Sequence, residues 1–176
     1  RERGFAADPT FDFDGPRQEN GAGFYQKNIR NGRRHSAAAA FLVPVLGRRN
    51  LFVWPQTQAL RLTIESGRVT GVDVRREGAP SHARARREVI LAAGAIESPK
   101  LLMLSGIGPA PDLKRLGLPV VHDLPAVGGN LQDHLRVPVR WSARTPLAPS
   151  TVSAGLFAYS KAAAARRPAS APDIQF

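Results

Sequence analysis

Hydrophobic and polar residues alternate most regularly in the middle of the chain. A half-buried strand is predicted where apolar side chains recur at every second position, at Leu60, Leu62 and Ile64. A second run of the same period contains Val72 and Val74, and Ser66-Gly67 supplies turn residues between the two runs. We therefore predict an antiparallel hairpin here, followed by a polar loop over residues 77–83.

The alternation disappears in residues 88–94. Consecutive apolar residues there predict a strand that is covered on both faces, as in a parallel sheet between helices. A helix is predicted directly after it, over residues 98–104. Ser98 is suited to the N-cap, Pro99 to the first helical position and Gly106 to the position just beyond the end. The order of strand, glycine and helix is typical of a doubly wound α/β fold.

The flanking regions are less regular. Residues 1–34 are polar and rich in turn residues, which predicts a long loop. Ser36 precedes an alanine-rich run and predicts a short helix that Pro44 ends or kinks. A new period of two begins after residue 135. We therefore expect residues 1–135 to be the middle and later part of one domain, and residues 136–176 to be the truncated beginning of a second.

Both ends of the chain look cut. The start has neither an initiator methionine nor an apolar signal core. The second domain is predicted to open with a strand that contains Val137, Val139 and Trp141, and residues 173–176 alternate like a strand that no turn residue closes. These features indicate an internal fragment of a longer protein.

Composition narrows the functional classes. Hydrophobic residues make up 43% of the chain and charged residues 22%, as in globular proteins. The absence of cysteine excludes disulfides, thiolate metal sites and thiol catalysis, and it permits the cytoplasmic location that we expect. The four histidines lie far apart in sequence, so no metal site is expected. No apolar stretch approaches the roughly 20 residues that cross a bilayer, which leaves only peripheral membrane association open.

The net charge of +11 raises the alternative of a basic module that binds polyanions, because clustered Lys and Arg neutralise backbone phosphates. The basic pairs are scattered along the chain, at Arg33-Arg34, Arg48-Arg49, Arg75-Arg76, Arg86-Arg87 and Arg166-Arg167. They lack aromatic interleaving and a helix-turn-helix pattern. We therefore expect no specific nucleic-acid partner and favour solvated surface charge as the explanation.

Three small residues, Ala93-Gly94-Ala95, lie where the predicted strand passes into the predicted helix. In open α/β sheets, ligands sit beyond the carboxyl ends of the strands, and a helix N-terminus there offers N–H groups to phosphate. Small residues would let the backbone approach a dinucleotide closely. A tight turn that needs Gly94 explains the same residues nearly as well.

The stretch from Gly94 to Gly108, GAIESPKLLMLSGIG, resembles the second signature of the glucose-methanol-choline (GMC) oxidoreductase family at each defined position. Other stretches similar to family landmarks occur in the same order, at 13–15, 21–26, 31–34, 36–38, 50–51, 127–134 and 172–176. The resemblance covers nearly the whole chain and is strong up to His134. Within the family, the choline and aliphatic-alcohol dehydrogenases are the most similar.

The resemblance implies an α/β fold: part of a doubly wound, Rossmann-like FAD-binding domain with an antiparallel β-meander, and the start of a substrate-domain sheet. It implies FAD as cofactor and a small alcohol as substrate, oxidised by hydride transfer to the flavin, with the redox acceptor left unidentified. It also places the main chain of Ala59 at the adenine edge, and Ala93 and Gly94 against the adenosine diphosphate half of FAD.

Other parts of the family plan are missing from these 176 residues. The fingerprint G-x-G-x-x-G does not occur, and the family's catalytic histidine lies near its C-terminus, so no catalytic residue is assigned. His134 belongs to the Asn-Leu-Gln-Asp-His landmark, and a structural role with Asn130 and Asp133 is expected for it. We expect the chain alone to bind FAD weakly and to be inactive. An oxidase or a lyase on the same scaffold are the alternatives to a dehydrogenase.

Overall fold

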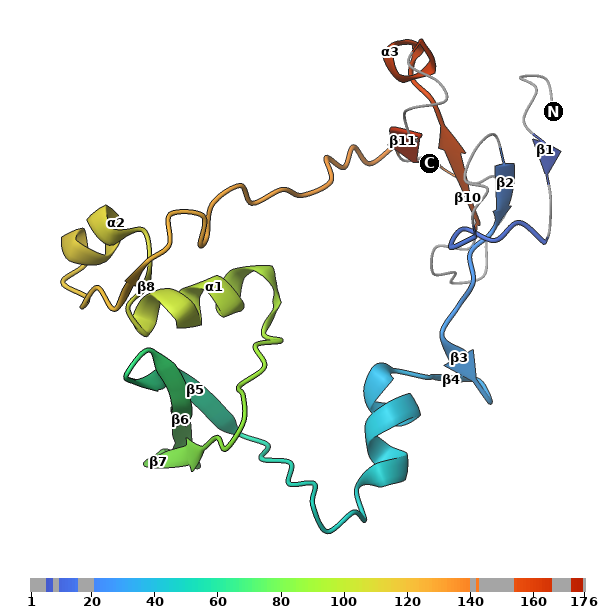
Figure 1. Cartoon of the computed structure of the whole chain (residues 1–176). Helices are drawn as coiled ribbons and strands as arrows, with labels where there is room; N and C mark the ends of the chain where they lie inside the picture. The colour runs from blue at the N-terminus through green and yellow to red at the C-terminus, as the bar shows by residue number, and fades with distance from the viewer. Residues whose placement is uncertain are drawn as a thin grey trace. The chain divides into compact units, whose positions relative to one another are not determined.

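The computed structural model describes residues 6–7, 10–15, 21–139, 142, 154–165 and 172–175. The chain divides into two compact units, one of residues 48–138 and one of residues 1–47 together with 139–176. Figure 1 labels the elements of both units. The predicted domain division at residue 135 concerns the parent protein and stays a prediction.

A three-stranded antiparallel sheet is the centre of the unit of residues 48–138. Its strands follow one another as a meander: β5 (Thr57–Glu65), β6 (Arg68–Arg76) and β7 (Ala79–Arg84). The predicted hairpin is confirmed, because β5 pairs with β6 in antiparallel register and Leu62 lies opposite Val72. Ser66 and Gly67 make its two-residue turn with φ angles of 49° and 76°, a geometry that suits the right-handed twist of the strands.

The polar loop predicted over residues 77–83 is wrong, because most of it forms β7. Glu77 and Gly78 make a second two-residue turn, with φ angles of 51° and 84°, so the chain returns at once beside β6. β7 lies at the edge of the sheet, where Pro80 and exposed polar residues are tolerated because one side of the strand has no ladder to complete. The sequence pattern does not predict β7, because apolar and polar residues do not alternate along it.

The strand predicted over residues 88–94 does not form. Residues 88–92 have no regular secondary structure, and the side chain of Ile90 is 79% exposed. An extended segment becomes a strand only when neighbouring strands take up its N–H and C=O groups. Among the described residues, no strand pairs with this segment. Residues 88–92 therefore have the composition of a strand that is covered on both faces, but no strand that the structure describes pairs with them.

Helix α1 (Gly94–Leu104) begins at Gly94, earlier than predicted. The Ser98 hydroxyl accepts a hydrogen bond from the main-chain N–H of Ala93 at 3.0 Å, so it ties down the entry to the helix from inside it and is not the N-cap. Pro99 is likewise inside the helix, where it removes one helical hydrogen bond. The predicted end is confirmed, because Gly106 adopts a φ of 82° just beyond the last helical residue.

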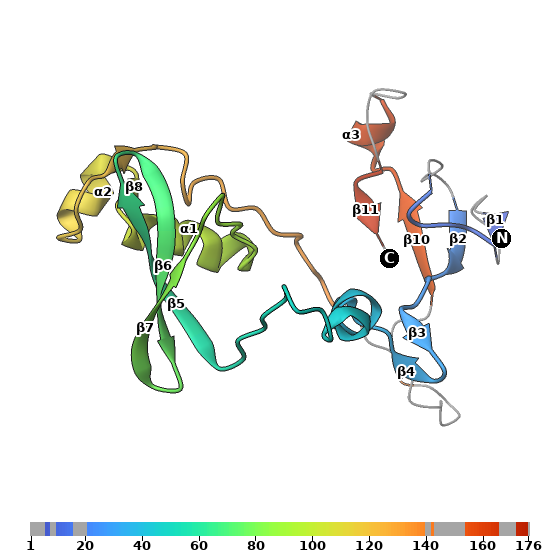
Figure 2. The same ribbon diagram turned by 60° about the horizontal axis from the view of Figure 1, so that its bottom comes forward.

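A small parallel pair of strands follows α1. β8 (Ile107–Gly108) and β9 (His122–Asp123) run parallel, and α2 (Ala110–Arg115) connects them. The Asp123 carboxylate accepts a hydrogen bond from the Ala110 N–H at 2.9 Å, which ties β9 to the start of α2. The buried apolar side chains of this unit are Leu62, Val74, Leu101 and Leu113, and Leu113 is fully buried. Figures 1 and 2 show α1 beside β5.

The other unit contains a four-stranded sheet in the order β1-β2-β10-β11. The strands are β1 (Ala6–Ala7), β2 (Gly21–Phe24), β10 (Ala154–Ala158) and β11 (Ile174–Gln175). Phe13 packs against Tyr25 and Phe157, with ring centroids 4.6 and 5.3 Å apart. The Gln26 side chain donates a hydrogen bond to the main-chain oxygen of Phe11 at 2.7 Å. This aromatic cluster holds the first and last segments of the chain together.

Several expectations for residues outside the meander and α1 need correction. Residues 1–34 are not one long loop, because they contribute β1, β2 and the hairpin of β3 (Ile29–Arg30) and β4 (Arg33–Arg34). These strands are too short for a sequence period to reveal them. The strand predicted at Val137 is absent: residues 137–139 have no regular structure, and Trp141 lies outside the described residues. The predicted C-terminal strand is present as β11.

The short helix predicted after Ser36 forms, although not as an α-helix. The Ser36 hydroxyl accepts a hydrogen bond from the Ala39 N–H at 3.3 Å. The chain then makes the π-helical turn η1 (Ala38–Leu42), followed by the 3₁₀ turn η2 (Val43–Val45) that contains Pro44. The change of helix type at Pro44 agrees with the predicted break. A second short helix, α3 (Lys161–Ala164), follows β10.

Ser105 joins α1 to the meander. Its hydroxyl accepts a hydrogen bond from the Leu62 N–H at 2.8 Å and donates one to the Leu101 carbonyl oxygen, and the residue is only 6% exposed. The Leu62 N–H belongs to the edge strand β5, so Ser105 supplies the partner that no further strand provides.

Replacing Ser105 by alanine is expected to lower the free energy of unfolding by about 1–3 kcal/mol, because it leaves a buried main-chain N–H without an acceptor. Urea unfolding measures the difference. Ser81→Ala is the control, since Ser81 is an exposed serine in the same unit. Equal stability of the two variants would show that water replaces the Ser105 hydroxyl.

Candidate functional site

The N-terminus of α1 is open. Gly94 has a φ of 90°, in the left-handed region, and a Cβ atom placed on it would meet no atom within 4 Å. The helix has no side-chain cap at Ala93. Its first turn therefore presents main-chain N–H groups and the positive end of the helix dipole to open space, an arrangement that binds phosphate. This is the position at which the sequence places Ala93 and Gly94 against a cofactor.

Ala59 lies on the edge strand β5, opposite Val74. The register shifts between Ala59 and Arg61, so Leu60 is the extra residue of a β-bulge. Bulges interrupt the ladder and re-aim the neighbouring side chains. The bulge therefore makes this end of β5 an irregular edge, next to the predicted main-chain contact.

The structure does not bring Ala59 and Gly94 to one point. β5 contacts α1 at the end of the helix that carries Ser105, whereas Gly94 opens the opposite end. At 1.5 Å per residue, the 11 residues of α1 span about 16 Å. One ligand that touched both positions would have to extend along the helix.

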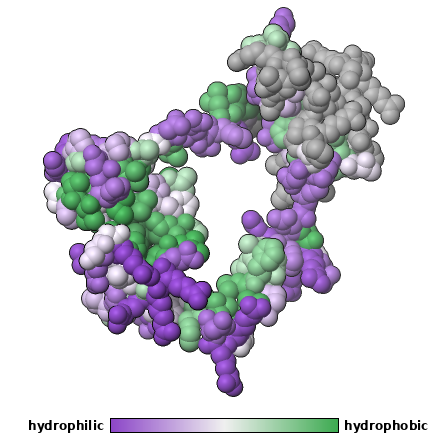
Figure 3. Space-filling view, in the orientation of Figure 1, coloured by the Kyte–Doolittle hydropathy of each residue, from purple (hydrophilic) through white to green (hydrophobic). Residues whose placement is uncertain are grey.

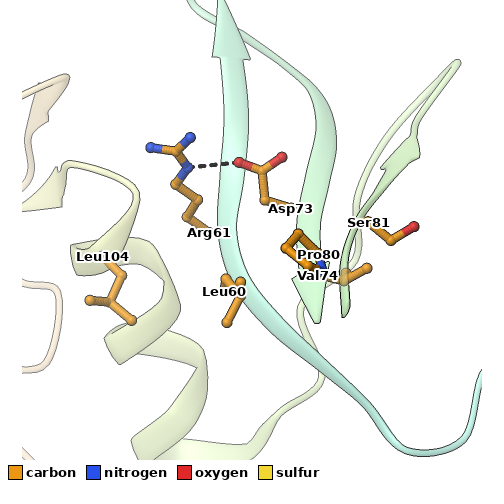
Figure 4. A pocket seen from close by; sticks show the side chains of 7 residues that line it. All are labelled: Leu60, Arg61, Asp73, Val74, Pro80, Ser81 and Leu104. Carbon is orange, nitrogen blue, oxygen red and sulfur yellow. Dashed lines mark hydrogen bonds and ion pairs between the residues drawn. The ribbon is translucent and has the colours of Figure 1, made fainter. Parts of the chain in front are cut away.

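A hollow of about 450 Å³ lies between the meander and α1, and Leu60, the residue after Ala59, lines it (Figure 4). Seven side chains line it: Leu60, Arg61, Asp73, Val74, Pro80, Ser81 and Leu104. Leu60 reaches it from the bulge and Leu104 from the last turn of α1. Its size falls within the range of small-molecule sites, and its lining is mainly apolar with a charged pair.

The charged pair belongs to a row of side chains that crosses all three strands. Asp73 on β6 accepts a hydrogen bond from Arg61 Nε on β5 at 2.7 Å and one from His82 Nδ1 on β7 at 2.9 Å. The Arg61 hydrogen bond, followed by that from His82, lowers the pKa of Asp73 below its usual 3.8. Both hydrogen bonds favour the ionised form of the Asp73 carboxyl group over the protonated form.

Because its pKa is lowered in the folded state, ionised Asp73 adds stability that is fully present above pH 3.8, its ordinary pKa. That contribution is lost as the pH falls through the folded pKa. We expect Asp73→Asn to be less stable than wild type at pH 7, with a difference that shrinks below about pH 4. Urea unfolding across this pH range tests it, with Glu88→Gln as a control outside the row. A difference that stayed constant with pH would contradict it.

His134, Asn130 and Asp133 are all exposed. The His134 main-chain N–H donates a hydrogen bond to the Asp133 carboxylate at 2.8 Å. The Asn130 side-chain oxygen accepts one from the Gln132 amide at 3.1 Å, and the Asn130 backbone has a φ of 53°.

The described residues contain no group of three or more His, Asp or Glu side chains placed to hold a metal ion. Among the helices that the structure describes, none is both long enough and apolar enough to cross a bilayer.

The unit combines helices with antiparallel sheets and has an open helix N-terminus. Comparison with known protein families shows to which family the chain belongs. Residues 1–136 match the family model described as GMC oxidoreductase, so the chain belongs to the GMC oxidoreductase family. This result confirms the resemblance of the stretch from Gly94 to Gly108.

Individual relatives agree with the family. The chain is 48% identical over 138 residues to the mitochondrial choline dehydrogenase of Homo sapiens and 47% identical over 161 residues to the oxygen-dependent choline dehydrogenase of Brucella anthropi. These alignments cover 78% and 92% of this chain, but only 23% and 28% of the relatives. The chain therefore spans about a quarter of the length of the curated relatives that it matches.

Solved structures give the same result for the fold. Pyridoxine 4-oxidase from Mesorbium loti is 39% identical with a TM-score of 0.57, and the match covers 60% of this chain and 21% of that one. An FAD-dependent oxidoreductase from Chaetomium thermophilum is 29% identical with the same TM-score, over 61% of this chain and 19% of its own.

Sequence reasoning missed the hollow and the row of charged side chains. Both depend on the register of three strands, and the third strand, β7, was predicted as a loop. Gly78 was the available signal, because the two-residue hairpin turn needs positive φ angles, which glycine adopts readily.

Proposed function

We propose that this chain is part of an FAD-dependent oxidoreductase that oxidises a CH–OH group, and that Ala59, Ala93 and Gly94 contact the adenosine diphosphate half of the cofactor. Gly94 is the observation that carries the proposal: it opens α1 with a φ of 90° and has free space where a side chain would lie. Membership in the GMC oxidoreductase family supports it.

The residues present fit such a cofactor. Open N–H groups at the start of α1 suit a pyrophosphate, and the absence of a side chain at Gly94 permits close approach. The mainly apolar hollow lined by Leu60, the residue after Ala59, suits a planar base, whose edge the main chain of this irregular strand would read. Bound FAD would supply the hydride acceptor. The residues of this chain would bind and orient its adenosine half.

The parent fold follows from the same proposal. Residues 88–92 would become a covered strand of a doubly wound sheet, and β10 and β11 would begin the sheet of a substrate domain over residues 136–176. The names of the relatives favour an alcohol such as choline as substrate. An oxidase remains the second candidate because a structural neighbour is named pyridoxine 4-oxidase. A lyase on the same scaffold and the cytoplasmic location also stay predictions.

Substitution of Gly94 tests the proposed contact in the full-length protein that carries this chain. Gly94→Val should weaken FAD binding by about tenfold or more, because its side chain would fill the space in which the cofactor approaches. Gly67→Val is the matched control, since Gly67 has a φ of 76° and open space, but lies in a hairpin turn. The measurement is flavin retained after purification and its affinity on reconstitution. Equal loss in both variants would indicate backbone strain alone.

Reduction of the flavin tests the reaction. Anaerobic mixing of the flavin-loaded full-length protein with choline and simple alcohols should bleach the flavin absorbance. Rapid recovery on admitting oxygen would indicate the oxidase, and no bleaching by any alcohol would indicate the lyase. A full-length protein that holds no flavin after reconstitution would overturn the proposal.

A further inference from the structure

A second hollow, of about 310 Å³, lies at the other end of the meander. Seven residues line it: Glu65, Arg68, Thr70, His82, Arg84, Ala85 and Arg86. They come from the end of β5, the start of β6, β7 and the chain just after β7. None of them was assigned a role in cofactor or substrate binding.

Strand register explains why these side chains converge. Asp73 lies opposite His82, and Gly71 lies opposite Arg84. Gly71 leaves a gap between them, and a Cβ atom there would come within 2.7 Å of the His82 ring. The imidazole therefore lies over Gly71, held by its hydrogen bond to Asp73 at 2.9 Å.

Arg68 is fixed by main-chain contacts. Its Nη2 donates to the carbonyl oxygen of Arg86 at 2.8 Å and lies 3.4 Å from that of Arg87. These contacts draw the chain after β7 back against the β5–β6 turn, so residues from three segments surround the hollow. An arginine held in this way loses little conformational entropy when it binds a ligand.

The hollow has an unbalanced charge. Three guanidinium groups, those of Arg68, Arg84 and Arg86, line it together with one carboxylate, that of Glu65. Within the part of the chain that the structure describes, none of these four groups forms a salt bridge, whereas Arg61 and Arg115 do. The lining therefore carries an excess of positive charge, which raises the electrostatic potential and attracts an anion.

We propose that this hollow binds a phosphate group, either inorganic phosphate or the phosphate of a small monoester. A planar guanidinium group can donate two parallel hydrogen bonds to two oxygens of one phosphate. A volume of about 310 Å³ accommodates one such group. A duplex would need a longer basic surface than these three arginines provide.

Calorimetric titration of the full-length protein with inorganic phosphate and, separately, with glycerol 3-phosphate tests the proposal. Arg68→Gln/Arg84→Gln should weaken phosphate binding by about tenfold or more, since it removes two charged donors. Arg115→Gln is the matched control: it removes one exposed arginine that is paired with Asp112 on α2. Both variants alter exposed side chains, and urea unfolding verifies that they fold. The readout uses no flavin signal, so it is independent of the proposed function.

Tighter binding of glycerol 3-phosphate than of phosphate would identify a monoester site, and the reverse order would identify inorganic phosphate. Either order supports the proposal when the double variant loses the binding. Equal affinity of Arg68→Gln/Arg84→Gln and Arg115→Gln would overturn it, as would the absence of any saturable heat with wild type. Binding of duplex DNA that both variants weaken equally would show a distributed basic surface instead of a site.

Discussion

Replacing Gly106 by alanine is expected to lower the free energy of unfolding by about 3–5 kcal/mol. Gly106 has a φ of 82°, and that conformation costs about 1–3 kcal/mol for a residue with a side chain. A Cβ atom there would also lie 2.7 Å from the carbonyl oxygen of Pro119 and 2.7 Å from Val121 Cγ2. The clash with Pro119 is with main chain, and the Gly106 carbonyl accepts hydrogen bonds from the N–H groups of Val121 and His122, so the segment has little freedom to move away.

Gly117→Ala separates the two causes. Gly117 also has a positive φ, 70°, but a Cβ atom there would meet nothing within 4 Å. Gly117→Ala should lower the free energy of unfolding only by the cost of a positive φ for a residue with a side chain, about 1–2 kcal/mol. Urea unfolding of both variants measures the difference. Similar losses at the two positions would show that the turn between α1 and β8 opens without cost.

Leu113→Ala is expected to destabilise the protein by about 2–5 kcal/mol. Leu113 is the one described side chain that is fully buried, at 0% exposure. It lies on α2, a helix of 6 residues that could not persist in water without tertiary packing. Removing its side chain leaves a cavity beside Gly108, whose Cβ position is 3.8 Å from Leu113 Cδ2.

Leu116→Ala is the control for this cavity. Leu116 follows α2 directly and is 56% exposed. Leu116→Ala should therefore lower the free energy of unfolding by well under half as much as Leu113→Ala. Thermal and urea unfolding of the two variants give the comparison. Comparable costs would mean that α2 does not pack as the structure has it.

The family signature divides into two physical parts. At its start, Gly94 faces open space and Ser98 holds the Ala93 N–H, so this end is free to meet a ligand. Towards its end, Ser105, Gly106 and Gly108 are packed against the rest of the unit, and the Cβ position of Gly108 is 3.0 Å from Met103 Cγ. The stability variants therefore test the second part without touching the proposed cofactor contact.

Apolar surface remains in this unit. Ile96 on α1 is 65% exposed and Leu104 is 41% exposed, and hydrophobic side chains gather over the α1 region in Figure 3. The segment 88–92 adds to this surface, since Ile90 is 79% exposed. Weak FAD binding by the chain alone stays a prediction.

Local sequence determined what depends on neighbouring residues. The period of two predicted β5 and β6, Ser66-Gly67 predicted their turn, and Gly106 predicted the end of α1, because each signal acts within a few residues. The family signature added the class of protein, since the spacing of its glycines and serines is specific. Ala93 and Gly94 were identified as candidate contacts in the same way.

Only the tertiary structure decided what depends on partners distant in sequence. β7 has no apolar period and exists because β6 offers it a ladder. Residues 88–92 have the composition of a strand, but no strand that the structure describes offers them a ladder. The bulge at Leu60, the Arg61–Asp73–His82 row and the basic hollow at Arg84 all follow from strand register. Register is a relation between segments, so the composition of each segment leaves it undetermined.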